Sequence, residues 1–249
     1  MTLAGKGEFA LALTLFERVL QLGTRIGLSY FTTRALNSIG FVHSELGDHE
    51  GAVKWNARGV VSAVDSRFPD PEVENNARIN LADNFMALGL LDDAETQYRI
   101  VEAFVRDPDP NAILDMWRYS QHLFASLAEL ALLRGQPGDA LRYAQECYDL
   151  AAPANHRKNV VKAKRLRGEA FLNLRRLEDA EVELDGALEI ARTLGNPPQL
   201  WKTLEARGRL EKARCRPSEA VPYLAEAIEL RRATIARRGD HPLVRELSI

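Results

Sequence analysis

The chain has 249 residues, 46% hydrophobic and 27% charged, which is typical of a folded globular protein and excludes a disordered chain or a fibre. Its 33 Lys and Arg against 35 Asp and Glu leave a formal net charge of −2, which gives no overall attraction to nucleic acid or to an anionic membrane. Its two cysteines, Cys147 and Cys215, are far apart and lack metal-ligand spacing, so neither a disulfide framework nor a zinc site is indicated.

Apolar and small residues recur at intervals of three and four along the chain, the spacing that places side chains on one face of an α-helix. This periodicity predicts an all-α protein, with helices expected at 7–22, 28–46, 48–65, 72–88, 92–106, 111–134, 138–151, 156–174, 177–194, 198–214 and 217–237. Paired prolines at 65–73 and 106–112 interrupt the helices. We interpret these two connections as stiff turns, with an acidic binding loop as the alternative.

The helices form a repeated pair, helix A followed by helix B. Each helix B carries an alanine near its start, at Ala12, Ala52, Ala94, Ala140, Ala180 and Ala220, with spacings of 40, 42, 46, 40 and 40 residues. Five residues before each alanine is an expected turn position, occupied by Gly7, Gly47, Gly89, Gly135, Arg175 and Cys215. Glycine there suits a chain that leaves a helix in the left-handed conformation. Small residues such as Gly40 and Ala52 let two helix axes approach closely.

At Gly40, Gly47, Ala52 and their equivalents the pattern resembles the tetratricopeptide repeat (TPR) family, although the period is about 40 residues where about 34 is usual. Long-period arrays of this style resemble the helical arms of bacterial signalling ATPases and transcriptional regulators. The resemblance implies a right-handed superhelical solenoid of antiparallel helix pairs. We expect one domain over 1–249, with a half repeat at 1–27, units at 28–69, 70–110, 111–155, 156–196 and 197–239, and a tail at 240–249.

The two ends of this array are expected to be incomplete. The first unit begins at its turn and supplies only a helix B, which would leave Phe9, Leu13 and Phe16 partly uncovered. This suggests a fragment of a longer protein or a chain that packs against another chain. The tail could fold back as a cap or begin a further helix.

Motifs for catalysis are missing from the sequence. There is no phosphate-binding GxxxxGK[ST] or GxGxxG loop, and no HExxH or GxSxG motif. His43 is expected to pack between helices, with a ligand or a base as the alternative. We therefore expect no enzymatic activity, no cofactor and no metal. Because no apolar run is long enough for a membrane helix and the N-terminus is poor material for a signal peptide, we expect a cytoplasmic protein.

Basic residues crowd the stretch from Arg157 to Arg167, and acidic residues crowd the stretch from Glu178 to Glu189 on the next helix. Local charge compensation between the two antiparallel helices is the first interpretation. A basic patch that recognises acidic peptide or phosphate is the second, and nucleic acid, which lacks support from interleaved aromatic residues, is the least expected.

In the TPR family, helix A residues that point away from helix B line the concave surface, and the resemblance implies a partner site there. Asn37 and Asn80 stand out because a carboxamide can both donate to and accept from a peptide backbone. The predicted function is a non-catalytic protein-interaction or regulatory scaffold that binds a peptide or partner domain. Self-association through the end repeats and small-molecule sensing are the alternatives. The candidate residues are Arg34, Asn37, Phe41, Asn76, Asn80, Asp83, His122, Glu129, Lys162, Arg165, Glu169, Lys202 and Arg209.

Overall fold

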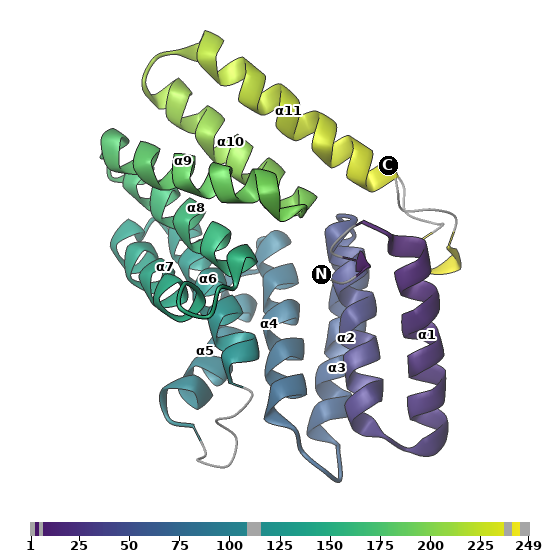
Figure 1. Cartoon of the computed structure of the whole chain (residues 1–249). Coiled ribbons are helices and arrows are strands. Elements are labelled where there is room, and N and C mark those ends of the chain that lie inside the picture. Colours follow the sequence, from purple (N-terminus) through teal and green to yellow (C-terminus); the bar gives the residue numbers. More distant parts are fainter. Residues whose placement is uncertain (1–2, 5–6, 109–115, 237–240, 245–249) are drawn as a thin grey trace. The chain divides into compact units, whose positions relative to one another are not determined.

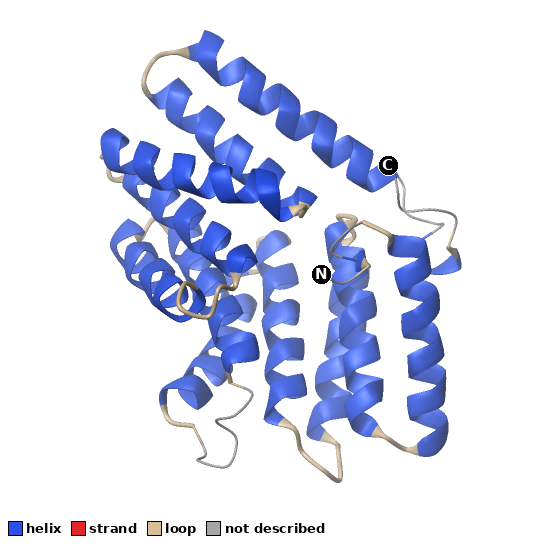
Figure 2. Cartoon of the chain, in the orientation of Figure 1, coloured by secondary structure: helices blue, strands red, loops and turns tan. Residues whose placement is uncertain are grey.

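The structure of the chain is a computed structural model that describes residues 3–4, 7–108, 116–236 and 241–244 (Figure 1). In these residues the regular elements are all helical (Figure 2), which confirms the predicted all-α class. The helices are α1 (Phe9–Ile26), α2 (Ser29–Glu45), α3 (His49–Val64), α4 (Pro71–Ala87), α5 (Leu91–Arg106), α6 (Trp117–Leu133), α7 (Pro137–Ala151), α8 (Arg157–Asn173), α9 (Leu177–Leu194), α10 (Pro197–Ala213) and α11 (Pro217–Ala236), followed by the short 3₁₀ helix η3 (Pro242–Val244).

Most predicted helix boundaries agree with these bounds to within two residues. The exceptions are the start of α6, expected at residue 111 and found at Trp117, and the end of α1. Helix α1 was expected to end at residue 22 but continues to Ile26 and ends at Gly27, whose φ of 70° is left-handed. Gly23 lies inside the helix, where a β-carbon would come within 2.8 Å of the Thr32 hydroxyl on α2. Gly23 therefore permits close packing and does not end the helix. The predicted helical residues 111–115 and 237 lie outside the described residues.

The chain divides into two compact units, one formed by 1–119 with 237–249 and the other by 120–236. In the first unit, α1 to α5 pack in sequence and α2 also packs on α4. In the second unit, α7 to α11 pack in sequence and α8 also packs on α10. Within each unit, α2 and α8 thus contact their own helix B and the helix A of the next pair, which is the packing of a helical repeat.

All six predicted turn positions adopt the left-handed conformation. The four glycines there have φ between 70° and 84°, and Arg175 and Cys215 both have φ of 60°. The left-handed residue lets backbone N–H groups cap the last carbonyls of the preceding helix; in the first full pair, Asp48 N–H donates to the His43 carbonyl at 2.9 Å. The turn chemistry predicted from the sequence is therefore confirmed even where glycine is replaced.

The repeated alanines mark the helix crossings, as the pattern predicted. Each of the six has at most 1% of its surface exposed. The starts of α3 and α4 are capped by side chains: Asp48 accepts from Gly51 N–H, and Asp70, followed by Pro71 in the first turn of α4, accepts from Glu72 and Val73 N–H.

The described part of the C-terminal tail, residues 241–244, packs on α1 within the first unit. His241 Nε2 lies 3.3 Å from a Glu17 carboxylate oxygen, and Leu243 contacts the apolar cluster that contains Phe9 and Leu13. The tail therefore folds back as a cap here. Residues 245–249 lie outside the described residues.

Candidate functional site

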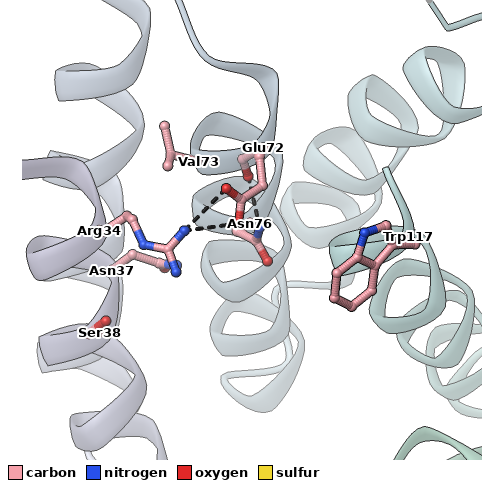
Figure 3. Close-up of a pocket in the computed structure, with 7 residues that line it drawn as sticks. All are labelled: Arg34, Asn37, Ser38, Glu72, Val73, Asn76 and Trp117. Carbon is pink, nitrogen blue, oxygen red and sulfur yellow. Dashed lines mark hydrogen bonds and ion pairs between the residues drawn. The ribbon is translucent and has the colours of Figure 1, made fainter. Parts of the chain in front are cut away.

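A polar hollow of about 330 Å³ lies in the first unit between α2 and α4, with Trp117 at the start of α6 on its far side (Figure 3). Its walls are formed by Arg34, Asn37 and Ser38 from α2, by Glu72, Val73 and Asn76 from α4, and by Trp117. Arg34, Asn37 and Asn76 were predicted for the partner site, and the structure brings them together.

The Arg34–Glu72 ion pair crosses this hollow. Arg34 Nη1 lies 3.0 Å and 3.1 Å from the two carboxylate oxygens of Glu72, and it also donates to the Tyr30 hydroxyl at 3.0 Å. The Glu72 side chain is 9% exposed whereas that of Arg34 is 43% exposed, so the pair offers its cationic side to solvent. Asn76 Nδ2 donates to the Glu72 backbone carbonyl at 2.8 Å, which fixes the neighbouring wall.

A second, more apolar hollow of about 390 Å³ lies on the other side of α2. It shares Arg34, Asn37 and Ser38 with the first hollow. Its remaining walls come from Ala4, from Phe16 and Val19 of α1, from Phe31, Ala35 and Phe41 of α2, and from Asn80 of α4. The two hollows therefore place a polar and an apolar surface on either side of one strip of α2.

Asn37 and Asn80 belong to a hydrogen-bonded network that runs beneath this strip. Asn37 Oδ1 accepts from Asn80 Nδ2 at 3.0 Å and from Asn56 Nδ2 at 2.7 Å. Asn84 Nδ2 donates to Asn56 Oδ1 at 3.2 Å, and Asn84 Oδ1 lies 2.9 Å from His49 Nδ1. Asn56 and Asn84 are 0% and 1% exposed, so the network carries polar groups through the core of the first unit.

Four predicted residues of the second unit meet in an ion-pair network. Arg165 on α8 pairs with Glu169 at 2.6 Å and with Glu129 on α6 at 3.7 Å, and Arg209 on α10 pairs with Glu169 at 3.1 Å. Burial opposes the charged form of Arg165, but Glu169 and Glu129 outweigh it and hold the pKa of the guanidinium above its usual value. Arg165 is only 3% exposed, so it is a buried ion-pair partner and offers little surface to a ligand.

The basic stretch of α8 is compensated locally, in agreement with the first interpretation. Glu183 on α9 lies 2.7 Å from Arg167 and 3.4 Å from Lys164. These contacts join the paired helices of one repeat and reduce the charge available to an anionic ligand.

The other predicted residues are Asp83, His122, Lys162 and Lys202. Asp83 accepts a hydrogen bond from Tyr98 on α5 at 2.6 Å, so it is oriented toward its own helix B and not away from it as predicted. His122 and Lys162 are partly buried, and Lys202 is exposed on α10.

His43 packs between helices as predicted, and it also has a polar role. It is 4% exposed, its Nδ1 lies 2.6 Å from Asp48 Oδ2, and its ring lies 6.3 Å from the Trp55 ring. Because Asp48 caps α3, this contact ties the end of α2 to the start of α3.

Sequence reasoning missed several residues of the two hollows. Glu72 and Val73 follow the Pro71 turn and looked like ordinary first-turn residues, and Trp117 adjoins a proline-rich segment. Phe16 was expected to be partly uncovered and does line the apolar hollow with Val19, whereas Phe9 and Leu13, expected to be uncovered with it, are buried at 1% and 0% exposure. Asn56 and Asn84 fell on buried helix stripes, where an asparagine needs hydrogen-bond partners.

In the part of the chain that the structure describes, no helix is both long and apolar enough to span a lipid bilayer. The same residues contain no group of three or more His, Cys, Asp or Glu side chains placed to hold a metal ion.

Comparison with known proteins identifies the fold. No protein-family model matches the sequence, and no curated protein sequence matches it significantly. Among solved structures, BtubC from P. vanneervenii matches 93% of this chain and 92% of its own, with a TM-score of 0.64 and 17% identity. The Rap conjugation gene regulator of plasmid pLS20, solved with the Phr* peptide, matches 97% and 72%, with a TM-score of 0.62 and 15% identity. A putative kinesin light chain of Podosopora anserina with TPR-like repeats matches 81% and 95%, with a TM-score of 0.52 and 16% identity. The chain therefore has the fold of TPR-like repeat proteins.

Proposed function

We propose that this chain is a non-catalytic protein-interaction module that binds an extended peptide segment of a partner across α2 in the first unit. The observation that carries the proposal is the pair of hollows that share Arg34, Asn37 and Ser38. An extended peptide turns every second side chain to the same face, so an apolar side chain can enter the hollow of Phe16 and Phe41 while the side chain two residues along faces the polar hollow.

The finer context is also part of this proposal. We place the module in the cytoplasm, as the regulatory arm of a larger signalling or transcription-regulating protein. The peptide-bound Rap regulator, which has the same fold, supports this placement. In that setting the peptide would change the activity of a covalently attached or bound regulatory partner.

Binding can be tested with pools of N-acetylated, C-amidated hexapeptides, each with one fixed apolar or aromatic residue. We expect pools with Leu, Ile or Phe to bind the full chain. Val19→Glu, which places a charge in the apolar hollow, should abolish binding, whereas Val61→Glu on the exposed face of α3 should leave it unchanged. Absence of binding by every pool at millimolar concentration, or equal binding by both variants, would overturn the proposal.

Self-association is a second candidate function, because α1 carries an exposed apolar stripe. Leu11, Leu15, Leu22 and Ile26 lie on one helical face and are 43–60% exposed. A second copy of the chain could cover this stripe. Light scattering over a concentration series should then detect a dimer that Leu15→Lys with Leu22→Lys dissociates, and a strict monomer at all concentrations would eliminate this function.

A further inference from the structure

The network beneath the candidate site has a fixed hydrogen-bond direction. A carboxamide can be turned end for end without changing its shape, so its direction has to be set by partners that can only donate or only accept. Two backbone carbonyls do this. Asn84 Nδ2 donates to the Asn80 carbonyl at 2.7 Å, and Asn56 Nδ2 donates to the Asn37 carbonyl at 3.3 Å.

These two contacts determine every other group in the chain of amides. Because the Asn84 nitrogen faces the Asn80 carbonyl, Asn84 Oδ1 faces His49 Nδ1, which must therefore carry hydrogen and donate. Because the Asn56 nitrogen faces α2, it donates to Asn37 Oδ1 while Asn56 Oδ1 accepts from Asn84. The donors thus run in one direction, from His49 through Asn84 and Asn56 to Asn37.

The direction of the chain decides what the two hollows offer to a ligand. Asn37 Oδ1 accepts from two donors, so toward a ligand Asn37 offers its Nδ2 hydrogens, which donate to none of the residues that the structure describes. Asn80 uses its Nδ2 toward Asn37, so its Oδ1 is left as an acceptor. Both residues line the apolar hollow, and Asn37 also lines the polar one (Figure 3).

We propose that Asn37 and Asn80 form a donor–acceptor pair of fixed polarity that hydrogen-bonds the backbone N–H and carbonyl of one residue of the bound segment, and that His49 is a positioning residue that holds Asn84 in the orientation set by the backbone carbonyls. Asn37 donates to the ligand carbonyl and Asn80 accepts from the ligand N–H. This inference rests on the proposed function for the ligand, but the direction of the network is a property of the chain alone.

Gly40 provides the space that this hydrogen-bonded network needs. A β-carbon on Gly40 would lie 2.5–2.7 Å from the carboxamide of Asn56, so a larger residue there would displace the central member of the network. His49, half-buried at the start of α3, acts on the ligand only through Asn84 and Asn56.

The direction of the network can be tested without any ligand. Nitrogen-15 NMR of the full chain should show His49 with hydrogen on Nδ1. The side-chain NH₂ groups of Asn56 and Asn84 should exchange slowly with solvent, and that of Asn37 should exchange rapidly. A neutral His49 that carries its hydrogen only on Nε2, or protection of Asn37 equal to that of Asn56, would overturn the proposal whatever the ligand is.

The hydrogen bonds of Asn37 and Asn80 to the ligand backbone are tested with the best-binding hexapeptide pool. Asn37→Asp keeps an oxygen for Asn56 and Asn80 but replaces the outward donor with an acceptor, so we expect a loss in affinity of about tenfold or more. His49→Leu should weaken binding roughly threefold to tenfold, and His49→Gln, which can still donate to Asn84, should restore affinity to within about twofold. Val61→Glu, on the exposed face of α3 and outside both hollows, serves as the control.

A backbone-ester scan of the peptide identifies the group that is read. One ester position should weaken binding to the wild-type chain and have no effect on Asn80→Ala. Binding that is insensitive to Asn37→Asp and His49→Leu would overturn this inference and leave peptide binding intact, whereas absence of binding by all pools would overturn the proposed function alone. Thermal unfolding of each variant separates loss of positioning from loss of fold.

Discussion

Gly40 on α2 and Asn56 on α3 are in such close contact that the glycine leaves space for the buried carboxamide and for nothing larger. A small residue at a helix crossing commonly accommodates an apolar neighbour, as Gly168 does for Leu184 and Gly208 does for Leu224. In the α2–α3 pair the space is used for a polar side chain that hydrogen-bonds Asn37 and Asn84. The repeat geometry and the proposed recognition of ligand therefore depend on the same position.

Gly40→Ala should destabilise the protein, because the new methyl group meets a hydrogen-bonded amide that cannot move without losing partners. We expect the free energy of unfolding to fall by roughly 1–3 kcal/mol. Gly59→Ala on α3 is the matched control, since its β-carbon would find ordinary contacts at 3.6–3.7 Å. It should be neutral or add about 0.5–1 kcal/mol through helix propensity. Urea unfolding of both variants measures this, and equal effects would contradict the assigned contact.

Arg175→Gly should stabilise the protein. Arg175 adopts φ of 60° at a turn position where the first four repeats have glycine. The left-handed conformation costs an L-residue about 1–2 kcal/mol, and the greater flexibility of unfolded glycine returns part of that, so we expect a net gain of about 0.5–1 kcal/mol. Gly47→Ala at the equivalent turn should have the opposite sign. Chemical unfolding curves provide both values. A loss of stability in Arg175→Gly would show that the Arg175 side chain makes a contact that stabilises the fold by more than the left-handed conformation costs.

The turns and the crossings could be predicted from the sequence because both are local and repeated. The left-handed residue is followed five positions later by a buried alanine in every copy, so Arg175 and Cys215 could be aligned with glycines. The candidate site was harder to predict from the sequence, because it depends on the directions in which individual side chains point. Asn37 and Asn80 were recognised as polar residues of helix A. Asn37 accepts from Asn56, 19 residues away on α3, and from Asn80, 43 residues away on α4, and no periodicity indicates these contacts.

Arg165 illustrates the same limit in the second unit. Its helical position suggested a residue that faces a ligand, but it is buried between Glu129 and Glu169. A long cationic side chain can turn toward either face of its helix, and the direction depends on where carboxylates lie. For Arg165 these carboxylates come from α6 and from a position one turn further along α8. The pattern of spacing places the backbone of Arg165 correctly and leaves its side chain undetermined.

Arg165→Met should be strongly destabilising, because it removes the buried cation beside the Glu169 carboxylate. That carboxylate is 14% exposed and would then pair with Arg209, which is more exposed. Removing one member of a buried pair costs about 3–5 kcal/mol. The double variant Arg165→Met with Glu169→Gln removes the isolated charge and should recover a large part of that loss. Urea unfolding of the two single variants and the double variant gives the coupling energy. Strict additivity would mean that the two side chains do not interact.

The buried thiol of Cys147 should make the free energy of unfolding sensitive to alkaline pH. Its thiol is buried on α7 beside the Asn159 carbonyl, 3.8 Å away, and burial raises its pKa from 9.0 to about 12, with a smaller opposing effect from Lys162. In the unfolded chain the thiol ionises near 9, whereas the folded chain keeps the proton until about pH 12. The folded state therefore binds more protons between these values, and its stability falls as pH rises through that window, by up to about 1.4 kcal/mol per pH unit. Urea unfolding at pH 8, 9 and 10 should show a steeper decline in the wild type than in Cys147→Ala. Cys215→Ala, which changes the exposed thiol, should follow the wild type, and parallel declines in all three proteins would rule out a role for the buried thiol.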